Sequence, residues 1–271
     1  MISRFCLSLA AACVLGVSSL WAQSLTVAAT TSTANSGFLE FVTPLAEADL
    51  GFEIRFLAVG TGRALRLLEQ GDVDAALVHD VAGELSAVGA GHAQSRRPVM
   101  RNEFIILGPA DDTLLDDVET GAQALKLIQD EQRPFISRGD DSGTHRAELR
   151  LWGMSGQMPP SGVTDAASRW YRETGQGMGA SLTIAAGMQA YILSDTSTWA
   201  SHGLNQRLSV KVMGDPEMAN PYGYLVGNAG THPHLLAQEA ERFGDWLRSQ
   251  AGREAIAGFQ LGGMSLFEPL F

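Results

Sequence analysis

The fold is decided around Ser137–His145, where the chain reads SRGDDSGTH. The apolar run Pro134–Ile136 before it is typical of a short strand, and Arg146–Trp152 after it has a helical pattern. The stretch is therefore predicted to turn a strand into a helix. It contains a guanidinium, hydroxyls and glycines, and the first N–H groups of a helix have no partner within the helix. Such a turn is suited to binding an anion.

Two stretches near the N-terminus have the same design. The β-rich run Leu25–Ala29 is followed by Thr30–Gly37, which begins with four hydroxyl residues and opens a helical pattern. A second predicted strand, Phe52–Val59, is followed by Gly60–Gly62 and then by a helix over Arg63–Gly71. Ligands of open α/β sheets bind at the carboxyl ends of strands. Capping is the alternative role of the hydroxyl run, but one residue suffices to cap a helix, so we favour a binding loop.

The order of the predicted elements indicates an α/β fold with two lobes. A β-α-β-α-β block is followed by a second α/β block, a return strand and terminal helices. We expect lobe 1 to comprise residues 23–108 and 220–271 and lobe 2 to comprise residues 109–219, with the ligand in the cleft between them. Besides the elements above, we predict strands at Ala75–His79, Val99–Pro109, Ala190–Leu193 and Tyr222–Val226, and helices at Thr120–Gln132, Ala180–Gln189, His234–Gln250 and Arg253–Phe259.

The first residues are typical of a secretory signal. Arg4 precedes the apolar run Phe5–Val17, so residues 1–22 are predicted to be a signal peptide that is cleaved near Ala22 to release a periplasmic protein. Both cysteines, Cys6 and Cys13, lie inside this segment. A lipid anchor at Cys13 is the alternative, which the alanines before it disfavour.

Composition limits the classes of partner. The 271 residues carry a formal net charge of −11, and 45% of them are hydrophobic, which suffices for a sizeable core. The negative charge disfavours nucleic acid and anionic membranes as partners. An anionic ligand therefore needs a locally built site.

An ordered set of motifs extends over nearly all of the chain that follows the signal. The motifs are Ala29–Thr33, Val59–Leu65, Gly71–Asp74 with Val78-His79, Asn102–Pro109, Ser137–His145, Trp170-Tyr171, Gly177–Gly179 and Asn220–Gly223. Together they resemble the tungstate-binding periplasmic components of ABC uptake transporters. The chain is similar, less closely, to the wider group of phosphate- and molybdate-binding proteins.

The resemblance implies a periplasmic-binding-protein fold of type II, with two crossovers between the lobes. It also implies tight binding of tungstate, with molybdate as a competitor, and delivery to a membrane permease by a monomer. By the same resemblance, the residues that hold the oxyanion are Thr30, Thr31, Ser32 and Thr61 from lobe 1, and Arg138, Ser142, Gly143 and Thr144 from lobe 2.

Two points of this implied site stay open. Whether Thr30 or Thr31 makes the contact is unresolved, because the run begins with Ala29 where the family usually has a further threonine. Asp140 and Asp141 carry the wrong charge to face a dianion, so we expect them to cap the helix or to orient the guanidinium. Molybdate, phosphate or sulfate as the true ligand is the alternative within binding proteins, and a periplasmic sensor domain would share the same cleft.

An enzyme is the alternative of a different class. Ser142 as nucleophile and His145 or His79 as base would suit a hydrolase, since Ser142 and His145 share one face of a helix. However, the chain has no Gly-x-Ser-x-Gly elbow. We therefore favour a binding protein with no catalytic residues, cofactor or metal cation, and we interpret His79-Asp80 as a hydrogen-bonded structural pair.

Overall fold

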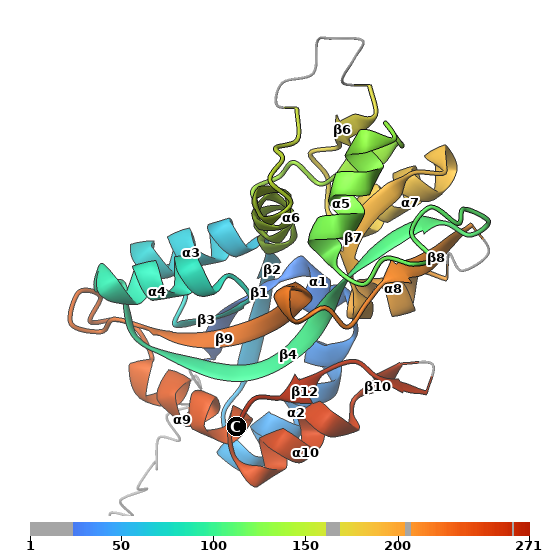
Figure 1. Cartoon of the computed structure of the whole chain (residues 1–271). Helices are drawn as coiled ribbons and strands as arrows, with labels where there is room; N and C mark the ends of the chain where they lie inside the picture. The colour runs from blue at the N-terminus through green and yellow to red at the C-terminus, as the bar shows by residue number, and fades with distance from the viewer. Residues whose placement is uncertain (1–23, 161–168, 204–206, 262) are drawn as a thin grey trace, which may run out of the picture.

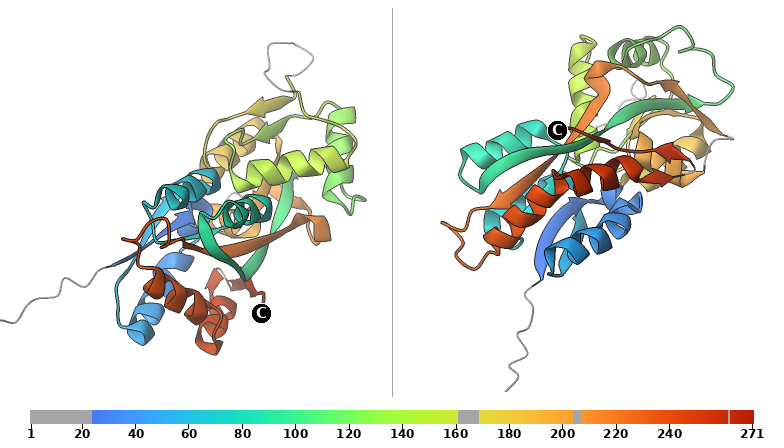
Figure 2. Two further views of the ribbon diagram at one scale, coloured as in Figure 1. Left: turned by 90° about the vertical axis from the view of Figure 1, so that its left-hand side faces the viewer. Right: turned by 90° about the horizontal axis from the view of Figure 1, so that it is seen from below.

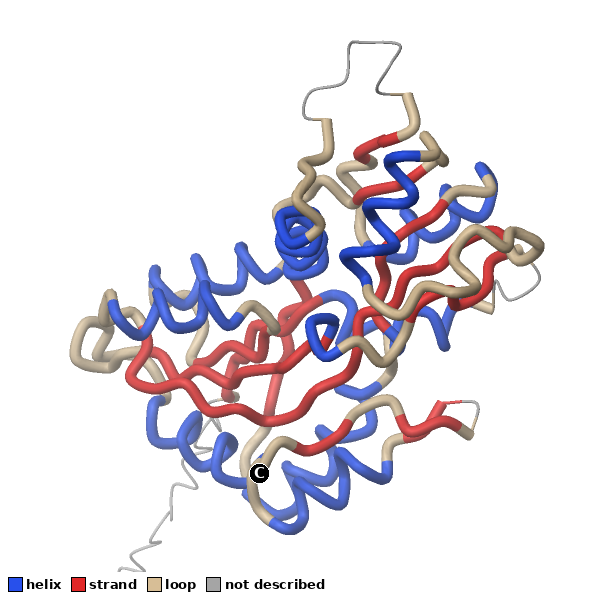
Figure 3. The backbone as a smooth tube through the Cα atoms, in the orientation of Figure 1, coloured by secondary structure: helices blue, strands red, loops and turns tan. Residues whose placement is uncertain are grey.

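One long strand joins the two halves of the β-sheet. The computed structural model describes residues 24–160, 169–203, 207–261 and 263–271, so the predicted signal peptide and both cysteines lie outside the described residues. Strand β4 (Ala93–Pro109) pairs with β9 (Ala219–Gly227) as far as Glu103 and with β7 (Tyr191–Asp195) from Phe104 onward. Figures 1 and 3 show β4 running from one lobe into the other.

Lobe 1 contains three parallel strands that end at the same edge of the sheet. Its strand order is β2-β1-β3-β9-β4, and Thr30 at the end of β1 pairs with Val59 at the end of β2. The elements not yet given are β1 (Leu25–Thr30), α1 (Thr31–Asn35), α2 (Phe38–Leu50), β2 (Ile54–Val59), α3 (Thr61–Gln70), β3 (Ala75–Val78), α4 (Val81–Gly89), α9 (Ala237–Leu247), α10 (Gln250–Gly258), β10 (Gln260–Leu261), β11 (Met264–Ser265) and β12 (Glu268–Pro269).

Helices cover both faces of the lobe 1 sheet because its strands are apolar on both sides. Phe38 of α2, Phe243 of α9 and Ile256 of α10 pack with Val27 on one face. Helices α3 and α4 cover the other face, where Leu68 is among the buried residues. Figure 1 shows these two helical layers above and below the strands. Strands buried on both faces are typical of parallel α/β sheets.

Lobe 2 repeats this layering around the sheet order β4-β7-β5-β6, with β8 pairing to β4. Trp152 and Phe135 belong to the core beneath α5 and α6, and Leu182 of α7 belongs to the core of the opposite face. The elements are α5 (Gly121–Asp130), β5 (Phe135–Ser137), α6 (Gly143–Met154), β6 (Tyr171–Glu173), α7 (Met178–Met188), α8 (Thr196–His202), β8 (Leu208–Val212) and a 3₁₀ helix (Pro216–Met218).

Two strands, β4 and β9, cross between the lobes, as the views of Figure 2 also show. They are antiparallel to each other, and Asn102 lies opposite Asn220 in their register. The two predicted crossovers are therefore present. The predicted lobe boundaries remain a prediction. The partner strand of β4 changes between Glu103 and Phe104. We therefore propose that Phe104–Leu107, which the predicted boundary assigned to lobe 1, move with lobe 2.

The predicted strands and helices are present, with shifted ends, but several elements escaped prediction. Helix α4, helix α8 and strand β8 were not predicted, and the hydroxyl run expected as a loop forms the short helix α1. Both α1 and α8 are rich in serine and threonine, which favour caps and turns over helix interiors. Among the described residues, no helix has the length and apolarity needed to cross a membrane.

Candidate anion-binding site

The carboxyl ends of strands from both lobes face each other. β1, β2 and β3 end at Thr30, Val59 and Val78 in lobe 1, and β5 ends at Ser137 in lobe 2. A cavity of about 250 Å³ lies between the loops that follow β2 and β5, and it is lined by Gly60, Gly62, Arg63, Arg66, Asp140, Asp141 and Ser142. The predicted binding loops of the two lobes are thus brought together.

Arg138 is a buried guanidinium at this junction. Arg138 is only 5% exposed, and its Nη2 donates to Asp140 Oδ2 at 2.6 Å. Its Nη1 lies 3.4 Å from Thr144 Oγ1, and its Nε is buried without a partner among the described residues. The expectation that a neighbouring aspartate orients Arg138 is confirmed for Asp140. A buried guanidinium with a free donor is suited to receive an anion.

The backbone of the Arg138 loop is held by a second loop of lobe 2. The N–H of Thr174 donates to Ser137 O at 3.0 Å, and the N–H of Gly175 donates to Arg138 O at 2.8 Å. The strand β6 that leads into this second loop is parallel to β5, with Ser137 opposite Glu173. The main chain at Ser137 and Arg138 is therefore held in place by hydrogen bonds from the loop that follows β6.

The start of α6 supplies donors beside the guanidinium. Ser142 is the N-cap, and its Oγ accepts the main-chain N–H of His145 at 3.3 Å. His145 Nδ1 accepts the main-chain N–H of Asp141 at 3.1 Å. These are the contacts of a helix cap, and the His145 imidazole is not bonded to the Ser142 hydroxyl. The arrangement does not favour the hydrolase alternative.

The hydroxyl run of lobe 1 forms a compact cluster at the end of β1. Thr30 Oγ1 lies 3.1 Å from Ser32 Oγ and 2.7 Å from Thr33 Oγ1, and all three residues are buried. Thr31, in contrast, is half-buried. Thr30 thus acts as the cap of α1, which is the role considered as the alternative to ligand binding. The two roles are compatible because a hydroxyl both accepts and donates.

Thr61 of lobe 1 has a buried hydroxyl that lacks a hydrogen-bond partner among the described residues. The residue is 1% exposed. Burying a hydroxyl without a partner costs free energy. Gly60 and Gly62 on either side of Thr61 line the cavity, whereas Thr61 itself is not among its lining residues.

Two further residues of this region were not predicted as site residues. The Tyr222 hydroxyl is buried without a partner among the described residues and lies near Ser32 and Thr33. The His79 ring packs against Tyr222 with ring centroids 4.9 Å apart. Both residues belong to motifs that carried the family resemblance, so position in those motifs was the signal available in the sequence.

The predicted pairing of His79 with Asp80 is wrong. His79 Nδ1 hydrogen-bonds to Asn220 Oδ1 at 2.9 Å, whereas Asp80 forms an ion pair with Arg146. Successive residues after a strand point in different directions, so adjacency in sequence does not make two side chains partners. Each finds its partner on an element distant in the chain.

The ion pair between Asp80 and Arg146 joins the two lobes. Arg146 on α6 also binds Asp141 through two bonds of 3.0 Å, and these hydrogen bonds raise the pKa of Arg146 and lower the pKa of Asp141. A Cβ built at Gly62 would lie 3.4 Å from Arg146 Nη2. The start of α3 therefore lies against this ion pair, and the lobes are in contact at the rim of the cavity.

A buried carboxyl lies beneath the Arg138 loop. Glu148 Oε1 accepts from Tyr171 Oη at 2.8 Å and from Trp152 Nε1 at 3.2 Å. Burial raises the pKa of Glu148 from 4.5 to about 7. The folded state thus binds this proton more tightly than the unfolded state. Its contribution to stability is complete below pH 4.5 and is lost as the pH rises through about 7.

We expect Glu148→Gln to flatten this pH dependence. The free energy of unfolding of the wild type should fall by about 2–3 kcal/mol as the pH rises from about 5 to 8, because Glu148 must ionise in the core. Glutamine keeps an acceptor oxygen for Tyr171 and Trp152 and does not titrate. Calorimetric melting across this range checks the prediction, with the exposed Glu131→Gln as the control that keeps the wild-type slope. An equal slope in all three proteins would contradict it.

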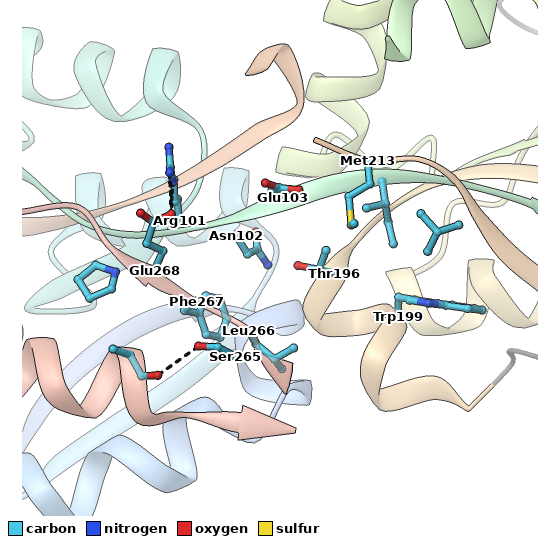
Figure 4. A pocket seen from close by; sticks show the side chains of 14 residues that line it. Arg101, Asn102, Glu103, Thr196, Trp199, Met213, Ser265, Leu266, Phe267 and Glu268 are labelled. Carbon is cyan, nitrogen blue, oxygen red and sulfur yellow. Dashed lines mark hydrogen bonds and ion pairs between the residues drawn. The ribbon is translucent and has the colours of Figure 1, made fainter. Parts of the chain in front are cut away.

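A larger cavity behind the crossing strands does not have the chemistry of an anion site. It measures about 640 Å³ and includes Trp199, Leu266 and Phe267 in its lining. Figure 4 shows these side chains around the cavity, with Arg101 directed to Glu268. The two charged groups form an ion pair of 2.6 Å, so this arginine already has an anionic partner. The smaller, polar cavity between the loops that follow β2 and β5 remains the candidate site.

Comparison with known proteins agrees with this geometry. Residues 17–251 match the family model described as a PBP superfamily domain. The tungstate-binding protein TupA of Peptoclostridium acidaminophilum is 38% identical over 251 residues, which cover 91% of this chain and 85% of that protein.

Solved structures are similar over most of their length. The tungstate-binding protein TupA from Desulfovibrio alaskensis G20 has a TM-score of 0.78 and 39% identity, covering 91% of this chain and 98% of its own. The tungstate ABC transporter structure from Geobacter sulfurreducens has a TM-score of 0.79 and 37% identity, covering 88% of this chain and 99% of its own.

Proposed function

Because this chain belongs to the PBP superfamily, and within it to the family of the TupA tungstate-binding proteins, we propose that it captures tungstate in the periplasm and delivers it to the permease of an ABC transporter. The observation that carries the proposal is the buried Arg138, whose Nε lacks a partner among the described residues and whose partner Asp140 lines the cavity between the lobes. We propose that Thr30 or Thr31, Ser32, Thr61, Ser142, Gly143 and Thr144 complete the site.

The chemistry of tungstate matches a site made of donors. Tungstate is a dianion whose oxygens accept hydrogen bonds and donate none. Arg138 supplies a fixed charge and a planar set of donors, and hydroxyls and main-chain N–H groups supply the rest. About seven bonds of roughly 1.5–3 kcal/mol each, reduced by the cost of closing and ordering the site, suffice for nanomolar affinity.

The acidic residues at the cleft support the donors and do not oppose the ligand. Asp140 is bonded to Arg138 and to the N–H of Ser142, and Asp141 is bonded to Arg146. Each carboxylate thus has a cationic partner. Protonated phosphate needs an acceptor for its proton, but the nearby carboxylates are already paired with Arg138 and Arg146. Sulfate is smaller than tungstate. Selectivity for tungstate is therefore expected, with molybdate as a competitor.

Calorimetric titration of the purified protein with tungstate, molybdate, sulfate and phosphate tests the proposal. We expect nanomolar tungstate binding, displacement by molybdate, and sulfate and phosphate at least about 100-fold weaker. Thermal shifts with the same anions give an independent reading, since a ligand that binds the folded state raises Tm. Phosphate or sulfate bound as tightly as tungstate would contradict the proposed specificity.

Thr61→Val should separate affinity from stability. Valine has the shape of threonine without the buried hydroxyl, so the unliganded protein should be at least as stable as the wild type. Tungstate affinity should fall by about tenfold or more, because one hydrogen bond to a charged ligand is lost. Calorimetry and thermal melting measure the two effects. The control is Thr43→Val in α2, whose hydroxyl donates to Leu39 O at 2.6 Å and which should leave affinity unchanged.

If Thr61→Val binds tungstate as tightly as the wild type, Thr61 is not a ligand residue. If the variant instead loses stability without ligand, its hydroxyl has a partner in the folded protein. The first result would remove Thr61 from the proposed site. The second would contradict only the expected stability, because a hydroxyl that already has one partner can still bind a ligand.

A further inference from the structure

We propose that His79 is a positioning residue of the anion site and that a buried chain of hydrogen bonds, from Asp195 through Asn102 and Asn220, holds its ring with the proton on Nδ1. The binding part of this proposal rests on the proposed function, whereas the position of the proton does not. The chain joins elements of both lobes through the two crossing strands.

The hydrogen bonds of this chain are continuous. Asn102 Nδ2 donates to Asp195 Oδ1 at 3.4 Å and to Ser197 Oγ at 3.3 Å. Asn220 Nδ2 donates to Asn102 Oδ1 at 2.6 Å, and Asn220 Oδ1 lies 2.9 Å from His79 Nδ1. All five residues are buried. Figure 4 shows Asn102 on β4 near the start of α8, where Thr196 lies.

The carboxylate of Asp195, at one end of this hydrogen-bond chain, determines which group donates and which accepts in each bond. An ionised carboxylate only accepts hydrogen bonds, so Asn102 must turn its NH₂ group toward Asp195. Its oxygen then receives the NH₂ group of Asn220, and the oxygen of Asn220 requires a donor from His79 Nδ1. The hydrogen bond made by one imidazole nitrogen decides which nitrogen is protonated. The neutral ring therefore carries its proton on Nδ1.

Asp195 is well suited to anchor the chain. It is the N-cap of α8, and its Oδ1 accepts the N–H of Thr198 at 2.9 Å while its Oδ2 accepts the Thr198 hydroxyl at 2.7 Å. Ser197 Oγ also donates to Oδ1. Both oxygens of the Asp195 carboxylate therefore accept hydrogen bonds from α8. The hydrogen bond that Asp195 accepts from Asn102 sets the direction of the hydrogen-bond chain.

The His79 ring, at the other end of the hydrogen-bond chain, contacts the start of α6 in lobe 2. A Cβ built at Gly143 would lie 2.8 Å from His79 Cε1 and 2.9 Å from His79 Nδ1, so the ring edge touches the backbone at the start of α6. Burial lowers the pKa of His79, although Asp195 acts in the opposite direction and Arg138 in the same. A neutral ring held in one orientation fixes how closely Ser142–Thr144 approach lobe 1.

Nuclear magnetic resonance on the whole protein tests the position of the proton. The two nitrogen shifts of ¹⁵N-labelled His79, assigned by loss of the signal in the His79→Asn variant, distinguish the two neutral forms of the ring. We expect protonation on Nδ1 from about pH 6 to 8. Protonation on Nε2, or a ring that is charged at pH 7, would overturn the hydrogen-bond chain, whatever the ligand of the protein is.

Two substitutions at His79 test its effect on binding. The amide nitrogen of asparagine can replace Nδ1, whereas that of glutamine lies nearer the place of Nε2. Tungstate affinity should therefore fall at least about tenfold further in His79→Gln than in His79→Asn, because only the latter keeps the donor to Asn220. A purely space-filling role predicts the opposite order, since glutamine is larger.

The same pair of substitutions at His234 serves as the control. His234 Nε2 bonds to Gly71 O in lobe 1, away from the described cavity, so both variants should bind tungstate equally well. Equal affinities of the two His79 variants would overturn the positioning role. If wild-type protein fails to bind tungstate, the proposed function fails, and the proton position is then decided by the resonance experiment alone.

Discussion

Replacing Arg138 with alanine is expected to weaken tungstate binding by at least tenfold. Arg138 is a buried guanidinium bonded to Asp140, which lines the cavity, and its Nε has no partner among the described residues. Its removal takes away the charge that compensates the dianion and leaves Asp140 without its 2.6 Å partner. An unpaired carboxylate beside an anion opposes binding further. Isothermal titration calorimetry gives the affinity, and circular dichroism checks the fold.

Two other variants sharpen this test. Arg138→Lys keeps the charge but loses the planar set of donors, so its affinity should lie between those of the wild type and the alanine variant. Arg150→Ala is the matched control on α6, because Arg150 is exposed and bonds to Glu217 O. Unchanged affinity in Arg138→Ala would exclude Arg138 from the site.

Gly143→Ala is the second substitution with a large expected effect. A methyl group at this position would lie 2.8 Å from His79 Cε1 and 3.1 Å from His79 O, closer than carbon atoms normally approach. The ring has little room to move, because Asn220 bonds to it and Tyr222 packs on it. The lobes should therefore fail to close fully, and tungstate affinity should fall at least about tenfold.

The same helix offers the control for this substitution. Gly153 lies near the end of α6 and has no atom within 4 Å of a Cβ built on it. Gly153→Ala should leave affinity unchanged and stabilise α6 by about 0.5–1 kcal/mol. Small-angle scattering with and without tungstate would show compaction in the wild type and in Gly153→Ala, but less in Gly143→Ala. Full affinity in Gly143→Ala would mean that this contact is absent when ligand is bound.

Sequence patterns predicted the units that build the cleft because those units are local. A short apolar strand, a polar turn and an amphipathic helix occur together at Leu25–Leu50, Ile54–Gln70 and Phe135–Met154. Apolar spacing distinguishes strand from helix within a few residues, and hydroxyls and glycines between the two mark the carboxyl edge of the sheet. The family resemblance added the residues proposed to hold the ligand.

Sequence patterns failed where an element is short or rich in capping residues. Helix α4 extends over nine residues, and α8 contains three hydroxyl residues within its first three positions. Neither provides enough turns for a clear helical period. The long strand β4 was predicted only from Val99, because its first residues, Ala93–Pro98, are mainly polar.

The sequence by itself therefore determined the strand–turn–helix units, their order, and the donors that the carboxyl ends of the strands present. The tertiary structure alone decided which side chains are partners. His79 bonds to Asn220, Asp80 bonds to Arg146, and the His79 ring limits the approach of Gly143. Such contacts join residues far apart in the chain across two lobes. No local spacing encodes them, since they arise only when both crossing strands bring the lobes together.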